Sequence, residues 1–185
     1  MALSFSFTTY TKSEIKEMLD AASRTTRDIK PSVITAAQKK LLEVSKYIYL
    51  FSGVAKDDII KITNDVKFME FAEGEMVFDQ GEKNDEIFFL LRGELSVEIG
   101  HDGGYKEVAH IKPMELFGEM AFVSKKPRSA RIKSVDPKST VIKFVIDDDA
   151  YEASTCFAFM KLYKNISTIV AEKLEASNEV LAEHT

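Results

Sequence analysis

Glycine and proline gather in the middle of the chain, and this distribution constrains the fold more than any other feature. The 185-residue sequence has 8 glycines and 4 prolines, and all but two of them lie between Gly74 and Pro137. Both residue types break regular structure and favour tight turns. Only Pro31 and Gly53 lie outside this window. The chain therefore divides into two helical ends and a middle of short elements.

Apolar residues in the middle follow the patterns of β-strands. Residues 87–91 form a continuous apolar run, which is typical of a strand buried on both faces. The next run predicts one buried and one solvated face, because apolar and polar side chains alternate: Leu95, Val97 and Ile99 against Glu94, Ser96 and Glu98.

Turn signals separate these strands. Residues 102–104 predict a hairpin turn, followed by a return strand over residues 105–112. A second turn at 136–139 lies between strands predicted for 130–135 and 140–146. About eight such strands from residue 68 onward favour an α+β fold. Its centre would be an antiparallel β jelly roll or barrel (a double-stranded β-helix), flanked by N-terminal helices and a C-terminal closing helix.

Helical spacing is found before the strands. Residues 11–14 fit a capping box for a first helix, residues 24–30 read as a connection, and Pro31 and Ser32 predict the start of a second helix. These helices are either a docking arm or a cover for the barrel. A third helix is predicted over residues 57–66, with Ala55 as a poor N-cap.

A closing helix is predicted over residues 150–181, with one apolar stripe: Phe159, Leu162, Ile166, Ile169, Val170 and Leu174. The stripe would cover the barrel, pair two subunits, or do both. The run Asp147, Asp148 and Asp149 suits the positive end of this helix better than a metal ion.

Composition limits the function. With a net charge of −5, non-specific binding to nucleic acid is not expected. Cys156, the single cysteine, allows no internal disulfide and is interpreted as a buried structural thiol. No apolar run is long enough for a membrane span and no secretory signal is evident, so we expect a cytoplasmic protein. A metalloenzyme is disfavoured, since the three histidines (His101, His110 and His184) lack ligand spacing.

The stretch from Phe117 to Ala130 has the chemistry of an anion site. Gly118 permits a strained turn, after which residues 119–123 would form one helical turn with outward N–H groups. The planar guanidinium group of Arg128 can donate two parallel hydrogen bonds, which match two phosphate oxygens. Glu119, the only acid from 119 to 134, would be repelled by phosphate unless it meets sugar hydroxyls. The ligand is therefore interpreted as a nucleotide monophosphate.

This stretch resembles the phosphate-binding cassette of the cyclic nucleotide-binding domain family, F-G-E-[LM]-A followed by P-R-[AST]-A. The family spacing, with arginine nine residues after glutamate, is met by Glu119 and Arg128. Other family landmarks occur in order, at residues 50–54, 71–78 and 80–85. The resemblance covers residues 49–174 and leaves out residues 1–45.

The resemblance implies a cyclic AMP or, less favoured, a cyclic GMP sensor that is not an enzyme and needs no cofactor or metal. Glu119 would accept a hydrogen bond from the ribose 2′-hydroxyl, and Arg128 would hold the cyclic phosphate together with N–H groups of Ala121 and Ser129. Gly118 would leave room for the sugar. The implied ligand-binding residues are Phe117, Gly118, Glu119, Met120, Ala121, Pro127, Arg128, Ser129 and Ala130. Candidate base contacts are Leu95, Val97 and Met114, and candidate caps for the base are Tyr163 and Asn165.

Three units follow from these predictions: an N-terminal extension (1–45), the nucleotide-binding barrel (46–150) and a regulatory C-terminal helix (151–185). The expected partners are the nucleotide and either a protein effector or a second copy of the chain, with no nucleic acid or membrane. The alternative function is an interaction module of the same fold that binds no nucleotide.

Overall fold

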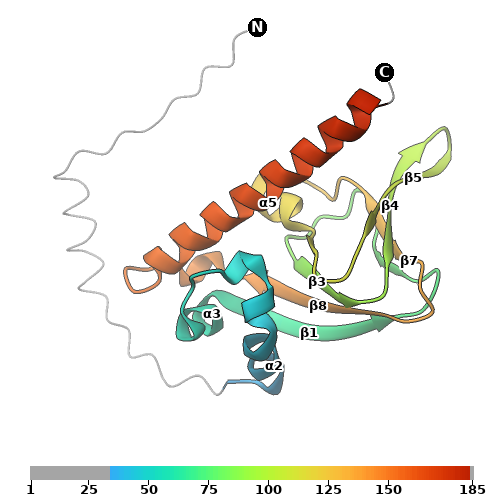
Figure 1. The fold of residues 1–185 in the computed structure, drawn as a ribbon. Coiled ribbons are helices and arrows are strands. Elements are labelled where there is room, and N and C mark those ends of the chain that lie inside the picture. The colour runs from blue at the N-terminus through green and yellow to red at the C-terminus, as the bar shows by residue number, and fades with distance from the viewer. Residues whose placement is uncertain (1–33, 184–185) are drawn as a thin grey trace, which may run out of the picture.

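A computed structural model describes residues 34–183 of the chain (Figure 1). Within this range eight strands form two four-stranded sheets, and every paired neighbour is antiparallel. Helices from both ends of the chain pack beside them. The α+β jelly roll predicted from the sequence is confirmed. The first predicted helix and the connection at 24–30 lie outside the described residues.

The two sheets draw their strands from alternating parts of the chain. The first sheet has the order β1 (Thr63–Phe71), β8 (Ser139–Ile146), β3 (Ile87–Arg92) and β6 (Leu116–Phe117). The second has the order β2 (Met76–Phe78), β7 (Arg131–Ser134), β4 (Leu95–His101) and β5 (Gly104–Ile111). This interleaving places β6 and β7, which border the predicted cassette, in different sheets, so the cassette crosses from one sheet to the other.

Strand β3 separates two hydrophobic cores. Phe88 and Leu90 point into an inner core between the sheets, whereas Ile87 and Phe89 point into an outer core shared with the helices. The inner core is made by Phe71, Phe78, Phe88, Leu90, Leu95, Ile111, Phe117, Ile132 and Val141. Because β3 has a core on both faces, it needs apolar residues at successive positions, as predicted for 87–91.

The prediction of a solvated face on β4 is wrong for two residues. Ser96 and Glu98 are both buried, whereas Ile99 is exposed near the end of the strand. The carboxylate of Glu98 is 2.6 Å from Nζ of Lys133 on β7, and the Ser96 hydroxyl lies within hydrogen-bond distance of that carboxylate. A buried acid is tolerated here because a cation from the neighbouring strand pairs with it.

The helices before the barrel differ from the prediction at their ends. Helix α2 (Ala36–Val44) begins after Thr35, which forms a capping box with Gln38; the start predicted at Pro31 and Ser32 lies outside the described residues. Two 3-10 turns follow, Ser45–Tyr47 and Tyr49–Phe51. Helix α3 (Lys56–Ile62) has no side-chain cap, as expected from Ala55. It stops at residue 62 rather than 66, because β1 follows with no connecting loop.

Helix α5 (Cys156–Glu183) runs along one side of the barrel and past the short helix α4 (Glu119–Ser124, yellow in Figure 1). It starts six residues later than predicted. Asp148 and Asp149 belong to a separate 3-10 turn, Asp148–Ala150, and Asp147 caps it, since its carboxylate accepts a hydrogen bond from the N–H of Asp149. Cys156 is only half-buried, so the interpretation as a buried thiol is wrong. No helix in residues 34–183 is both long and apolar enough to cross a membrane.

The apolar stripe of α5 is largely buried. Phe159, Leu162, Ile166 and Ile169 all lie in the outer core, while Leu174, further along, is exposed. Asn165 fastens the same face, since its amide donates to the carbonyls of Leu50 and Ser52 at 2.9 and 3.0 Å. The first half of α5 is therefore an integral part of the domain.

Candidate functional site

The candidate site begins where β6 ends and the short helix α4 (Glu119–Ser124) starts. Gly118 precedes α4 with a φ of +80°, a conformation that disfavours residues with a Cβ. A Cβ there would lie 2.7 Å from Nη1 of Arg128 and 3.1 Å from the carbonyl oxygen of Glu86. The close approach of Arg128 and of the Glu86 carbonyl therefore already favours glycine at this position.

Arg128 lies inside the protein, with only 3% of its surface exposed. Its Nη1 donates to the carbonyl oxygen of Gly118 and its Nη2 to that of Glu86, each at 2.8 Å. The guanidinium carbon lies 4.3 Å from the ring centre of Phe78 and 5.3 Å from that of Phe88. Backbone carbonyls and aromatic faces thus hold the guanidinium in place, and cation–π attraction contributes about 0.5–2 kcal/mol to this arrangement.

Burial lowers the pKa of Arg128 below its usual value, because the charged form loses its hydration. Nearby carboxylates oppose this shift, in the order Glu86, Glu82, Asp85 and Glu119. An arginine starts from such a high pKa that it stays protonated at neutral pH. The site therefore holds a buried positive charge with acidic groups around it.

Glu119 is also buried, with 2% of its side chain exposed. Its Oε1 is 2.8 Å from Nζ of Lys173 on α5. Its Oε2 is buried and has no hydrogen-bond partner among the described residues. The same holds for Nε of Arg128 and for Oδ1 of Asn84 in the loop before β3. All three atoms belong to the predicted cassette or to the loop that faces it.

A second network holds the loop that accepts Arg128. The carboxylate of Glu86 pairs with Lys143 on β8, and Lys143 also lies 2.6 Å from Asp65 on β1. Burial lowers the pKa of Lys143, but the hydrogen bonds that its amine donates to Asp65 and Glu86 outweigh this effect, so its pKa is raised. Glu86 therefore connects this buried lysine to Arg128, by its side chain on one side and its carbonyl on the other.

Most of the remaining cations in the basic stretch are neutralised within the domain. Lys125 pairs with Asp148 at 2.8 Å, and Arg131 makes a bidentate pair with Asp79 at 2.8 and 2.9 Å. This arginine lowers the pKa of Asp79 to about 2. Lys126 is exposed. The stretch is therefore not a free basic patch.

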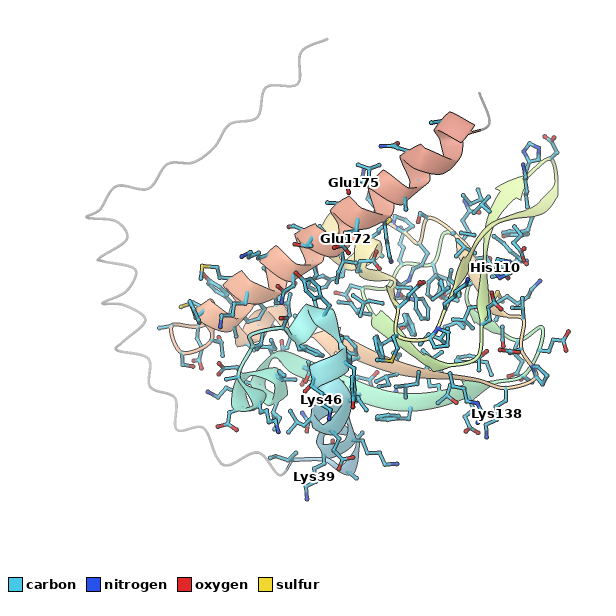
Figure 2. The ribbon with its side chains drawn as sticks, in the orientation of Figure 1. Lys39, Lys46, His110, Lys138, Glu172 and Glu175 are labelled. Carbon is cyan, nitrogen blue, oxygen red and sulfur yellow. The ribbon has the colours of Figure 1, made fainter. Side chains whose placement is uncertain are left out.

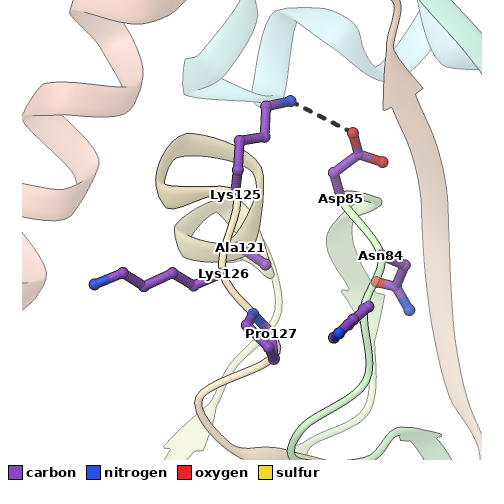
Figure 3. A pocket seen from close by; sticks show the side chains of 7 residues that line it. Asn84, Asp85, Ala121, Lys125, Lys126 and Pro127 are labelled. Atoms are coloured by element: carbon purple, nitrogen blue, oxygen red, sulfur yellow. Dashed lines mark hydrogen bonds and ion pairs between the residues drawn. The ribbon is translucent and has the colours of Figure 1, made fainter.

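An open cavity of about 610 Å³ lies beside the cassette (Figure 3). One wall is the loop with Lys83, Asn84 and Asp85, and the other comprises Ala121, Lys125, Lys126 and Pro127. Figure 3 shows Lys125 reaching across to Asp85, with 3.5 Å between the charged atoms. Glu119 and Arg128 are not among the lining residues, so the cavity lies beside these two side chains and does not enclose them.

The other predicted site residues lie around this centre in different environments. Phe117 is buried in the inner core and Ala121 is buried on α4, whereas Met120, Pro127 and Ser129 are exposed and Ala130 is partly buried. Among the candidate base contacts, Leu95 is buried in the inner core, Val97 packs against it, and Met114 is exposed. Tyr163 stacks on Phe122 of α4 with 6.0 Å between ring centres. Asn165 is committed to Leu50 and Ser52, which does not favour it as a cap for the base.

Sequence reasoning missed three residues of the centre: Glu86, Lys143 and Lys173. Glu86 and Lys143 are 57 positions apart, and Glu119 and Lys173 are 54 apart. Local patterns carry no sign of such pairs. A weak signal existed for Lys173, which follows Ile169 at helical spacing on the apolar stripe.

The fold and centre define a jelly-roll domain with a buried arginine and carboxylate in a glycine-led anion cassette. Residues 68–148 match the family model of the cyclic nucleotide-binding domain. The chain is similar to a cAMP-dependent protein kinase regulatory subunit from Mycosarcoma maydis, with 30% identity over 83 residues, 45% of this chain and 16% of the relative. It is also similar to a CRP-like cAMP-activated global transcriptional regulator from Mycobacterium tuberculosis, with 24% identity over 72% of this chain and 58% of the relative.

The regulatory domain of Toxoplasma gondii PKA, solved with cAMP, has the same fold, with a TM-score of 0.56 and 17% identity. The likeness covers 76% of this chain and 50% of that one. This chain therefore spans only part of each of these relatives. The resemblance found in the sequence is confirmed over residues 68–148, which match the model of the cyclic nucleotide-binding domain family.

Proposed function

We propose that this chain is a sensor that binds a 3′,5′-cyclic mononucleotide in the cassette and prefers cyclic AMP. Arg128 holds the cyclic phosphate together with the N–H groups of Ala121 and Ser129, and the Glu119 carboxylate accepts a hydrogen bond from the ribose 2′-hydroxyl. The remaining predicted site residues (Phe117, Gly118, Met120, Pro127 and Ala130) shape the cassette. The preference for cyclic AMP is supported by the names of the two relatives.

One observation carries this proposal. Two buried atoms that have no partner among residues 34–183 are an acceptor, Oε2 of Glu119, and a donor, Nε of Arg128. A buried polar atom that stays unpaired costs about 1–3 kcal/mol. A ligand with both a hydroxyl donor and an anionic acceptor satisfies both atoms, and a sugar phosphate has these groups. An interaction module without a ligand would gain nothing from keeping them.

Calorimetric titration of the purified chain with cyclic AMP and with cyclic GMP tests the proposal. We expect saturable binding of both, with the tighter binding for cyclic AMP. Tighter binding of cyclic GMP would overturn the preference. If neither nucleotide gives a heat of binding, the result favours the alternative, an interaction module of the same fold that binds no nucleotide.

We also propose that the signal leaves the domain through the C-terminal unit, residues 151–185. Glu119 and Arg128 are both enclosed, so a ligand reaches them only when the surrounding segments move. Helix α5 covers α4 through Tyr163 and Lys173. Its exposed end is then available to a protein effector or to a second copy of the chain.

Hydrogen exchange provides a direct measurement of this movement. Amide protection is expected to change within residues 151–181 when nucleotide is added, because the part of α5 that covers the cassette must release and then repack. Peptides from the second half of β1 (residues 67–71), which lies beyond Asp65 at the edge of the first sheet, serve as the internal reference. A change confined to residues 114–134 would mean that α5 is a static cover and that the signal leaves by another route.

A further inference from the structure

Lys173 continues the buried stripe of α5 at the point where the helix leaves the outer core. The stripe runs through Leu162, Ile166 and Ile169, and the next position on the same face, four residues on, is Lys173. Beyond it Leu174 is 60% exposed. Figure 2 labels Glu172 and Glu175 on this part of the helix. Up to residue 178, no described hydrogen bond or ion pair joins α5 to the barrel beyond Lys173.

The amine of Lys173 ties α5 to the segment that leads into the cassette. Nζ donates to the carbonyl oxygen of Leu116 at 2.7 Å and to Oε1 of Glu119 at 2.8 Å. The lysine side chain is 45% exposed, whereas the Glu119 side chain is 2% exposed. The lysine therefore reaches inward from the surface to a carboxylate that the protein otherwise encloses.

Because of this contact, the two oxygens of the Glu119 carboxylate have different environments. Oε1 is held by Lys173, while Oε2 is buried and has no partner among the described residues. A carboxylate fixed through one oxygen presents the other in a defined direction, which suits a single hydroxyl donor. The positive charge of the lysine also offsets the repulsion between Glu119 and an anionic ligand.

We propose that Lys173 is a positioning residue for the recognition of the sugar 2′-hydroxyl, acting through Glu119. This inference rests on the proposed function and adds the element that couples ligand to helix. By linkage, if the docked lysine strengthens the bond between hydroxyl and Glu119, the bound hydroxyl strengthens the docking of α5 by the same factor. The end of α5 then responds to the sugar, while its first half remains anchored by Asn165.

The test compares cyclic AMP with 2′-deoxy-cyclic AMP, which lacks the hydroxyl. In the wild-type chain the hydroxyl should be worth about tenfold or more in affinity, because it bonds to a charged group. In Lys173→Met this ratio should fall several-fold toward one, through weaker binding of cyclic AMP alone. Lys173→Arg should keep most of it, because the guanidinium still donates to Glu119. Lys164→Met, which removes an exposed lysine from the same helix, should leave the ratio unchanged.

Exchange of residues 170–178 without ligand is the second readout. Protection should fall in Lys173→Met and in Glu119→Gln, and the double variant should lose little more than either single one, because both changes break the same pair. Additive losses would show that the two residues act separately and would overturn the proposal. A common fall in affinity for both ligands would also overturn it, and so would tighter binding by Lys173→Met. A wild-type chain that binds neither ligand would instead overturn the proposed function and the coupling with it, while exchange would still measure the pair.

Discussion

Replacing Arg128 by leucine is expected to weaken the binding of cyclic AMP by about 2–4 kcal/mol, or about 30- to 700-fold in Kd. The guanidinium is the only buried cation of the cassette, and its Nε is available to a ligand oxygen. Leucine has no donor and leaves the phosphate without its counter-charge. Calorimetric titration of wild type and variant with cyclic AMP and cyclic GMP measures the loss.

Lys126 gives the matched control, because it lies two residues away in the same loop but is exposed. Lys126→Leu should change the affinity by less than about threefold, since an exposed cation contributes little. Arg128→Lys should keep the positive charge but lose the planar guanidinium, and should therefore bind the nucleotide with intermediate affinity. Equal affinities in the wild type and Arg128→Leu, for both nucleotides, would contradict the role of Arg128. Thermal unfolding of each variant shows whether the fold is kept.

Gly118→Ala is expected to be the most damaging single methyl addition in the cassette. An alanine at positive φ costs about 1–2 kcal/mol. Overpacking against Arg128 and the Glu86 carbonyl adds about 1–3 kcal/mol, because the guanidinium is held by two carbonyls and cannot retreat. The free energy of unfolding in urea should fall by the sum, and nucleotide binding should weaken because Arg128 is displaced.

Gly103→Ala separates the two contributions. Gly103 has nearly the same φ, +82°, but an added Cβ would meet nothing within 4 Å. Its variant should therefore lose only the backbone contribution and keep the affinity for nucleotide. If the two alanine variants unfold at the same urea concentration, the close packing around Gly118 has no energetic weight.

The sequence allowed the jelly roll to be predicted because its signals are local. Turn residues marked the ends of the strands, and the apolar run at 87–91 anticipated a strand with a core on each face. The burial of Glu98 was missed because it depends on Lys133, a partner on another strand. The end of α3 was missed because β1 begins directly after it, and no turn residue marks the change.

The order of the candidate site residues along the chain could be predicted from the sequence, but the contacts among their side chains could not. The positions of Gly118, Glu119 and Arg128 follow from spacing in one stretch of chain. Whether Arg128 is exposed or enclosed depends on Phe78, Phe88 and the carbonyl of Glu86, which the fold brings from other strands and loops. The contact of Lys173 with Glu119 depends on how α5 lies across the barrel, which helical periodicity alone does not determine.

The alternation along β3 has a mechanical consequence. Phe88, whose ring lies under the guanidinium of Arg128, is followed directly by Phe89 in the core shared with α5. Consecutive residues of a strand are separated by a rise of only about 3.3 Å and a rigid peptide unit. Phe88, which contacts Arg128, and Phe89, which packs in the core shared with α5, therefore cannot move independently of one another. We therefore expect the sheet to keep its geometry when a ligand binds, and any displacement to occur in α4 and the far end of α5.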